Sequence, residues 1–156
     1  LDIGVIYMGF QGDAAITVIV GEVSPQAREL IAATEGALNA GIGSARAEAR
    51  LGDISAAIQR YAEARGFSVV REYGGHGIGR EMHEEPLIHN FGVPGTGPVL
   101  KKGMTLALEP MLNAGDYPTR LDSDGWTVRT ADGSLSAHFE HTIAITNGEA
   151  EVLTVI

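Results

Sequence analysis

The pattern of apolar and polar positions first indicates strands. Residues 2–7 and 13–20 are rich in β-branched side chains, and the segment 8–12 between them contains two glycines. Strand-forming runs joined by a short glycine-containing segment are typical of a β-hairpin. The chain is therefore predicted to begin with two antiparallel strands.

The apolar residues then recur at helical spacing in two segments. Ser24-Pro25 combines an N-cap residue with proline at the first helical position, which predicts a helix that runs to about residue 40. A second helix is predicted to start from an N-cap at Asp53 and to end at Gly66. The first half of the chain therefore supplies one hairpin and two helices.

The second half of the chain is predicted to be mainly strand and loop. Further strands are expected at 67–71, 104–109, 126–129, 137–145 and 151–156. We expect 126–129 to pair with 137–145. Residues 86–103 are expected to form a long loop, because they contain three prolines and four glycines. The predicted fold class is α+β, with helices over an antiparallel sheet in a single domain of residues 1–156.

Composition and charge exclude several classes of protein. The 156 residues carry a formal net charge of −9, whereas a nucleic-acid groove needs basic patches. The chain has no cysteine, which excludes disulfide scaffolds and thiolate zinc sites and fits a cytoplasmic protein. No apolar run approaches the ~18 residues of a membrane span, and no signal peptide is visible.

The stretch 73–86 carries the most unusual chemistry. It places His76, His83 and three glutamates among four glycines at positions 74, 75, 77 and 79. We expect these glycines to allow positive φ angles and to leave open space over the His76 imidazole, where something approaches the backbone closely. The alternative interpretation is a flexible glycine-rich turn.

Four carboxylates stand on small-residue faces of the predicted strands. They belong to Asp2, Asp13, Glu109 and Glu140, and each one alone has an ordinary explanation as a turn former or an exposed strand end. If they converged with His76, they would repel one another, and two divalent cations would remove that repulsion. An oxygen-rich set with one imidazole suits Mn²⁺, Fe²⁺ or Co²⁺. The spacing gives the ligand types but does not show that they converge.

Taken together, these residues resemble the type I methionine aminopeptidases over essentially the whole chain. The motifs that carry the resemblance are Asp2 with Asp13, Gly75-His76-Gly77-Ile78-Gly79, His83-Glu84-Glu85-Pro86, Gly103-Met104-Thr105, Leu108-Glu109-Pro110-Met111, Asp124-Gly125-Trp126-Thr127-Val128 and Glu140-His141-Thr142.

The resemblance implies the pita-bread (creatinase/aminopeptidase-like) fold, in which two αβ halves enclose a pair of metal ions. The implied ligands are Asp2, Asp13, His76, Glu109 and Glu140, with Asp13 and Glu140 bridging the two ions. The implied cofactors are two divalent metal ions. Cobalt, manganese and iron are the first candidates, and zinc and nickel are further ones.

The resemblance also implies roles in catalysis. Glu109 would act as general base, and His83 would hold the substrate carbonyl and stabilise the tetrahedral intermediate. Met82 and Trp126 would line the methionine pocket, and His141 would support the ligands. The implied reaction is hydrolytic removal of the initiator methionine from nascent polypeptides whose next residue is small, with the ribosome as a candidate partner and no nucleic acid or membrane.

The chain departs from the family pattern at several positions. The family has a sizeable portion before the first ligand, whereas this chain starts at Leu1. We therefore expect a complete ligand set, incomplete catalytic machinery and poor turnover of Met-Gly-Met-Met. Although the family is usually monomeric, we also expect association through an uncovered sheet edge. Gly74 and Met82 stand where relatives often carry cysteine and an aromatic residue, which changes the pocket wall.

Three other interpretations remain open. An Xaa-Pro aminopeptidase or dipeptidase of the same fold would share the five ligands, but the segments 83–86 and 140–142 favour the methionine enzyme. A non-catalytic binding module on the same scaffold would typically lose ligands. An ordinary α+β domain with scattered acids predicts no metal binding.

Overall fold

The computed structural model describes residues 1–155 of the chain. The helices are α1 (Pro25–Ser44) and α2 (Leu51–Glu63). The strands are β1 (Asp2–Tyr7), β2 (Phe10–Ala15), β3 (Ser68–Val69), β4 (Gly74–Gly77), β5 (Glu84–His89), β6 (Thr105–Leu108), β7 (Met111–Asn113), β8 (Thr119–Leu121), β9 (Val128–Thr130), β10 (Ser136–His138), β11 (Glu140–Ala144) and β12 (Glu151–Val152).

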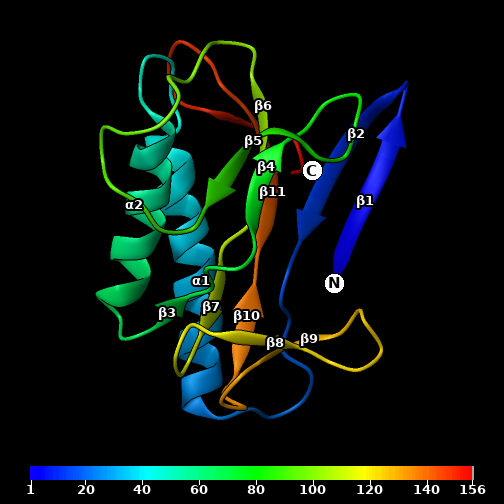
Figure 1. Cartoon of the computed structure of the whole chain (residues 1–156), viewed down its shortest axis with the longest axis vertical. Coiled ribbons are helices and arrows are strands. Elements are labelled where there is room, and N and C mark those ends of the chain that lie inside the picture. Colours follow the sequence, from blue (N-terminus) through cyan, green and yellow to red (C-terminus); the bar gives the residue numbers. More distant parts are fainter. Residues whose placement is uncertain (156) are drawn as a thin grey trace.

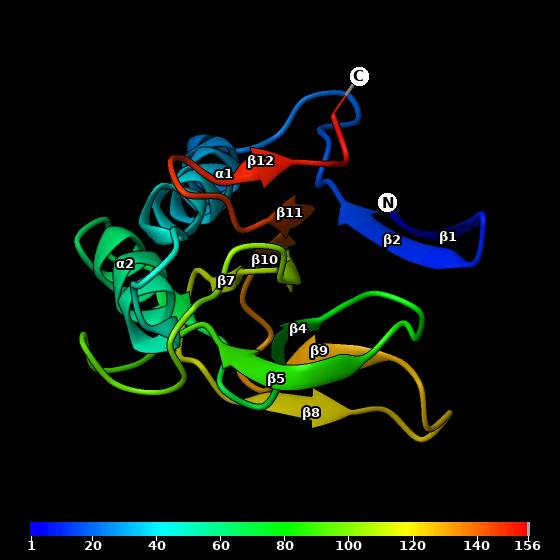
Figure 2. The same cartoon turned by 90° about the horizontal axis from the view of Figure 1, so that it is seen from above.

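The main sheet contains strands from both ends of the chain. Its strand order is β1-β2-β11-β6-β4-β5, and β12 pairs with β11 beside this path. All of these pairs are antiparallel. Figures 1 and 2 show both helices on one side of the molecule, while the β1–β2 hairpin projects from the other side. The predicted α+β class with an antiparallel sheet is therefore confirmed.

The hydrophobic core lies between the two helices and the sheet. Its largest fully buried side chains include Leu30, Leu38, Ile54 and Ile58 from the helices, and Leu106, Leu108 and Ile143 from the sheet. Each such side chain stabilises the fold by about 1.5–3 kcal/mol relative to an exposed position. Because the helices cover this face, the opposite face of the sheet is free to carry polar groups.

Local capping residues explain where the helices begin. The Ser24 hydroxyl accepts a hydrogen bond from the Ala27 amide at 3.2 Å, as the N-cap prediction requires, and α1 continues to Ser44, beyond the predicted end. The prediction for α2 was wrong in detail. Asp53 lies inside the first turn and accepts from the amide of Arg50, which is the N-cap residue.

The first hairpin turns earlier than predicted. Met8 and Gly9 both have positive φ, at 51° and 80°, which makes a two-residue turn that matches the twist of the strands. The expected strand 13–20 is wrong, because pairing with β1 ends at Ala15. Beyond that point the chain turns towards β10, where the Thr17 hydroxyl donates to the carbonyl of His138 at 2.7 Å.

Two other strand assignments were also wrong. Part of the predicted loop 86–103 belongs to β5, which tolerates Pro86 because an edge strand needs hydrogen bonds on one side only. The segment 126–129 contributes to β9, which pairs with β8. The predicted partner, 137–145, contains β11, which pairs with β2, β6 and β12. β2 and β6 are distant from β11 in sequence, so local patterns did not reveal these two partners.

The β1–β2 hairpin leaves much apolar surface uncovered. Its exposed side chains include Ile3, Val5, Ile6, Tyr7, Met8 and Phe10. Neither helix within residues 1–155 is long and apolar enough to cross a membrane.

Candidate metal centre

Strand register brings three of the predicted ligands to one face of the sheet. Asp2 pairs with Ala15, and Ala15 pairs on its other side with Glu140. Asp13 precedes Ala15 by two residues, so its side chain points to the same face. The small side chain of Ala15 lies between carboxylates from three neighbouring strands.

The other two predicted ligands join this face from β4 and the end of β6. His76 pairs with Ala107, and Ala107 pairs on its other side with Thr142. Glu109 follows Ala107 by two residues and points to the same face. The two leucines of β6 point the opposite way, into the core. The ligand face is therefore the face that the helices leave free.

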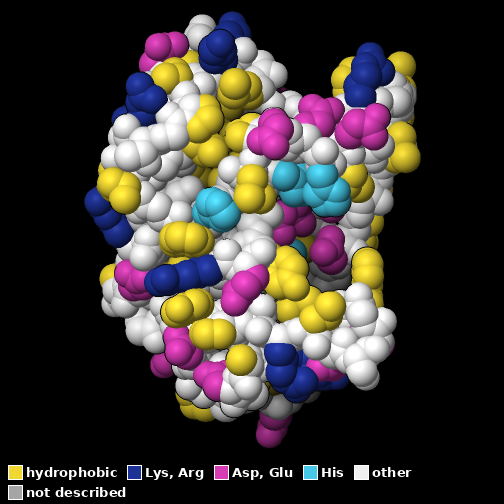
Figure 3. Space-filling model, viewed as in Figure 1, with side chains coloured by type: hydrophobic (Ala, Val, Ile, Leu, Met, Phe, Trp, Pro, Cys, Tyr) yellow, Lys and Arg dark blue, Asp and Glu magenta, His cyan; other side chains and the backbone are white. Residues whose placement is uncertain are grey.

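The ligand atoms lie close enough to share a cation. One donor atom each from Asp13, His76 and Glu140 lies within 4.8 Å of the other two. His76 Nε2 also lies 3.5 Å from Glu109 Oε1. The negative charge of Asp2 contributes to raising the pKa of Glu109 and of Glu140, in agreement with the strand register. Histidine and acidic side chains gather around a hollow beside the β1–β2 hairpin in Figure 3.

Backbone contacts fix the orientation of the His76 ring. Its Nδ1 lies 2.9 Å from the carbonyl oxygen of Gly77, so an Nδ1–H donor there leaves Nε2 facing the carboxylates. The expected positive φ angles are wrong for the four glycines of this stretch. Instead, these glycines allow the neighbouring strands to approach β4 closely. A Cβ on Gly75 would clash with the carbonyl oxygen of Ala107, and a Cβ on Gly77 would clash with that of Glu85.

Thr142 holds the backbone of Asp13. Its hydroxyl accepts from the Asp13 amide at 2.9 Å and donates to the Asp13 carbonyl at 2.8 Å. Thr142's own amide donates to the Thr154 hydroxyl at 3.2 Å, and this hydroxyl also lies 2.7 Å from Nδ1 of His141. His141, predicted to support the ligands, is therefore linked to Asp13 by hydrogen bonds through these two threonines.

Burial and mutual repulsion raise the pKa of two carboxyl groups. Burial, and then the charges of Asp13 and Asp2, raise the pKa of Glu109 to about 8. Burial, and then the charges of Glu109, Asp13 and Asp2, raise the pKa of Glu140 to about 9. Within residues 1–155, the buried Oε1 of Glu140 has no hydrogen-bond partner. An oxygen-rich cluster with an unpaired buried carboxyl oxygen fits divalent cations.

His83 lies beside this cluster on a loop that Glu84 holds in place. The rings of His83 and His76 are 4.4 Å apart at their centroids and are tilted by 62°. The Oε1 of Glu84 accepts from the amides of Arg80 and Glu81 at 2.8 and 3.0 Å. The exposed ring of His83 is therefore held at the rim of the hollow, on the side of His76.

The two predicted pocket residues lie in different places. The Met82 side chain packs against Gly4 of β1. A Cβ added to Gly4 would lie only 2.5 Å from the terminal methyl carbon of Met82. Met82 is thus next to the ligand strands. Trp126 is 87% exposed, in the turn between β8 and β9 where Asp124 accepts from its amide. The structure does not bring Trp126 to the cluster, and its role in the pocket stays a prediction.

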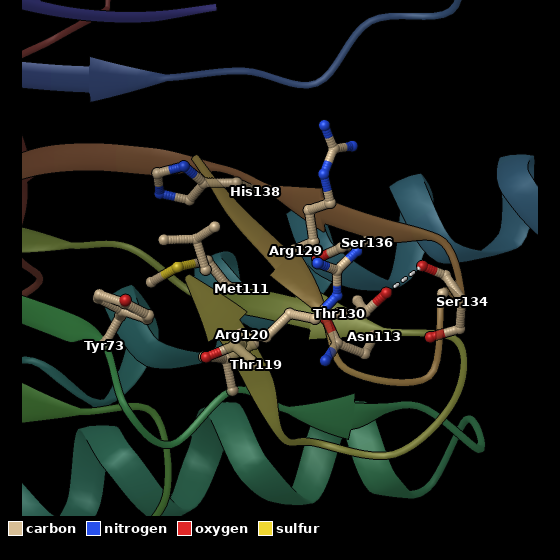
Figure 4. Close-up of a pocket in the computed structure, with 13 residues that line it drawn as sticks. Tyr73, Met111, Asn113, Thr119, Arg120, Arg129, Thr130, Ser134, Ser136 and His138 are labelled. Carbon is tan, nitrogen blue, oxygen red and sulfur yellow. Dashed lines mark hydrogen bonds between the residues drawn. The ribbon is translucent and has the colours of Figure 1, made fainter. Parts of the chain in front are cut away.

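His138 is a site residue that the sequence analysis did not select. Its Nε2 lies 3.8 Å from Glu109 Oε2, and burial lowers the pKa of its imidazole. It also lines a cavity of about 420 Å³, at the same end as Met111 and Tyr73 (Figure 4). Side-chain alternation places His138, two residues before Glu140, on the ligand face, and this is the signal that could have found it.

Comparisons with known proteins agree with this geometry. The sequence profile of metallopeptidase family M24 matches residues 1–147. A methionine aminopeptidase of Clostridium perfringens is 54% identical over 156 residues, which are 100% of this chain and 63% of that protein. The crystal structure of a Thermotoga maritima methionine aminopeptidase superposes with a TM-score of 0.97 at 52% identity, over 99% of this chain and 62% of the other. The expected resemblance and the pita-bread fold are confirmed.

A more distant structure shares the fold alone. The prolidase from Pyrococcus horikoshii has a TM-score of 0.75 at 22% identity, over 99% of this chain and 39% of the prolidase chain. The chain thus spans less than two thirds of the length of the relatives described here.

Proposed function

The chain belongs to metallopeptidase family M24, and on this premise we propose that it carries the metal centre of a methionine aminopeptidase. The observation that carries the proposal is the convergence of Asp13, His76 and Glu140 within 4.8 Å, with Glu109 beside them. This cluster lies on the sheet face that has no helix over it. The identity of 54% to a methionine aminopeptidase supports the choice of substrate.

The proposed cofactors are two divalent cations, with manganese, iron and cobalt as the candidates. Asp2, Asp13, His76, Glu109 and Glu140 would hold them. When bound, such cations lower the pKa of a coordinated water towards neutrality and polarise a carbonyl group. The match between donor chemistry and cation is supported by the unpaired buried oxygen of Glu140.

Glu109 is the proposed general base. Its carboxylate accepts the proton of the attacking water and then delivers it to the amine that leaves. Burial keeps Glu109 away from bulk water, and its distance of 3.5 Å from His76 places its carboxylate at the proposed metal centre. His83 donates a hydrogen bond to the carbonyl oxygen of the scissile bond, where negative charge develops. Its position beside His76 supports this role.

The proposed substrate is a peptide or nascent polypeptide with methionine at its N-terminus. The side chain of Met82, packed beside the ligand strands, forms part of the methionine pocket. Trp126 would have to approach from the β8–β9 turn to complete it. The proposed location of the protein is the cytoplasm, where nascent chains emerge from the ribosome.

The choice between peptides tests the proposed activity. The Mn²⁺-loaded protein should release methionine from Met-Ala-Ser faster than alanine from Ala-Pro-Ala. Because the chain covers 63% of one relative, the preference between the peptides is the criterion, and not the turnover number. His76→Ala should abolish both Mn²⁺ binding and release, whereas the control His89→Ala changes an exposed histidine outside the cluster.

Two results would contradict the proposal. A preference for Ala-Pro-Ala would instead support an Xaa-Pro peptidase of the same fold. Tight Mn²⁺ binding with no release from either peptide would contradict the proposed activity of this chain and leave the metal centre standing. Calorimetric titration of the same samples separates failure of the metal site from failure of catalysis.

A further inference from the structure

The carboxylate of Glu109 lies between two imidazole rings. His76 Nε2 is 3.5 Å from Oε1, and His138 Nε2 is 3.8 Å from Oε2. Among residues 1–155, the buried Nε2 of His138 has no hydrogen-bond partner. A buried polar nitrogen without a partner is costly, and a slight approach to Glu109 would satisfy it.

The backbone of His138 is fixed relative to the ligand strands. Its carbonyl accepts from the Thr17 hydroxyl at 2.7 Å, and its amide donates to the same hydroxyl at 3.0 Å. Thr17 lies just beyond β2, the strand that carries Asp13. On the other side, His138 pairs with Met111, two residues after Glu109. These two attachments place the His138 ring at one oxygen of the Glu109 carboxylate.

We propose that His138 is a positioning residue for Glu109, whose Oε2 it holds through an Nε2–H donor while Oε1 faces His76. The inference rests on the proposed function, because the orientation of Glu109 matters only if the cluster binds metal. The hydrogen bond does not require a charged imidazole. The Nε2 of His138 faces Oε2 of Glu109, so His138 acts through Glu109 and is not counted among the proposed ligands.

The cavity beside His138 makes this role testable by substitution. The ring borders a space of about 420 Å³ with Met111 and Tyr73 (Figure 4), so a side chain of different shape can be accommodated. His138→Gln keeps an N–H donor at similar reach. His138→Asn keeps the amide but shortens the reach, and His138→Leu removes the donor. His89→Gln is the matched control, because His89 is exposed on β5.

The experiment measures Mn²⁺ affinity by calorimetry and the visible absorption spectrum of the Co²⁺-loaded protein. Loss of a hydrogen bond to a ligand typically weakens metal binding by about 10- to 100-fold. We expect at least tenfold weaker binding and a changed Co²⁺ spectrum for His138→Asn and His138→Leu. His138→Gln should keep most of the affinity and the wild-type spectrum. Circular dichroism establishes that each variant is folded.

The outcomes separate this inference from the proposed function. If the wild type binds Mn²⁺ and all three variants match it, the positioning role is overturned while the metal centre stands. If His138→Gln is as damaging as His138→Leu, the donor is irrelevant and the inference is also overturned. If the wild type binds no Mn²⁺, the proposed function fails and the inference fails with it.

Discussion

Binding of Mn²⁺ should release protons, because two of the proposed ligands are protonated in the metal-free protein. The pKa of Glu109 is raised to about 8 and that of Glu140 to about 9. At pH 7 these carboxyl groups are ~90% and ~99% protonated. Each must lose its proton to coordinate a cation, so binding should release about two protons per site.

Calorimetry in buffers of different ionisation enthalpy measures this number directly. The observed enthalpy of Mn²⁺ binding, plotted against the ionisation enthalpy of the buffer, has a negative slope whose magnitude is the number of protons released. Glu140→Gln should lower the number to about one, because an amide has no proton to release. The control Glu149→Gln, an exposed acid outside the cluster, should leave it at about two.

The same pKa values fix the sign of the pH dependence. Apparent Mn²⁺ affinity should rise by up to about 100-fold per pH unit below pH 8, because two protons compete with the cation. The stability of the metal-free protein should fall as pH rises from about 4.5 to about 9. The folded state keeps protons that the unfolded chain loses near 4.5, the ordinary pKa of these groups. Mn²⁺ binding without proton release would refute this reasoning.

Three further predictions concern the scaffold around the site. Thr142→Val removes the hydroxyl that bonds the amide and the carbonyl of Asp13, so it should lower the free energy of unfolding in urea by about 1–3 kcal/mol and weaken Mn²⁺ binding. Unchanged Mn²⁺ affinity would contradict the role of Thr142 in holding Asp13. Gly75→Ala forces β4 away from β6 and should destabilise by about 1–3 kcal/mol, whereas Gly43→Ala, in open space on α1, should be neutral or stabilising. The exposed β1–β2 hairpin should cause concentration-dependent association in sedimentation experiments, and Val5→Lys should shift the protein towards monomer. A wild type that stays monomeric at high concentration would contradict this last prediction.

The sequence was informative wherever a local interaction decides the structure. Ser24-Pro25 begins α1 because a hydroxyl caps the first turn and proline suits that position. The hairpin of β1 and β2 follows from β-branched runs and a glycine turn, although the turn residues were misplaced by a few positions. Pairing between strands that are distant in sequence had no such local signal, as the pairing of β11 with β2 illustrates.

The site shows the same division between local chemistry and distant pairing. Residue types alone predicted an oxygen-rich set with one imidazole at His76. Their convergence depends on the order β2-β11-β6-β4, which joins segments more than 100 residues apart in the case of Asp13 and Thr142. The glycines near His76 were expected to free the backbone, but they serve close strand contacts. His138 was missed because its importance lies in its distance to Glu109.

A crystal of the protein soaked in Mn²⁺ tests the central claim most directly. Anomalous scattering should show ion density between Asp13, His76 and Glu140, bordered by Asp2 and Glu109. An empty cluster, with Mn²⁺ bound only at exposed acids such as those of the β8–β9 turn, would contradict the account.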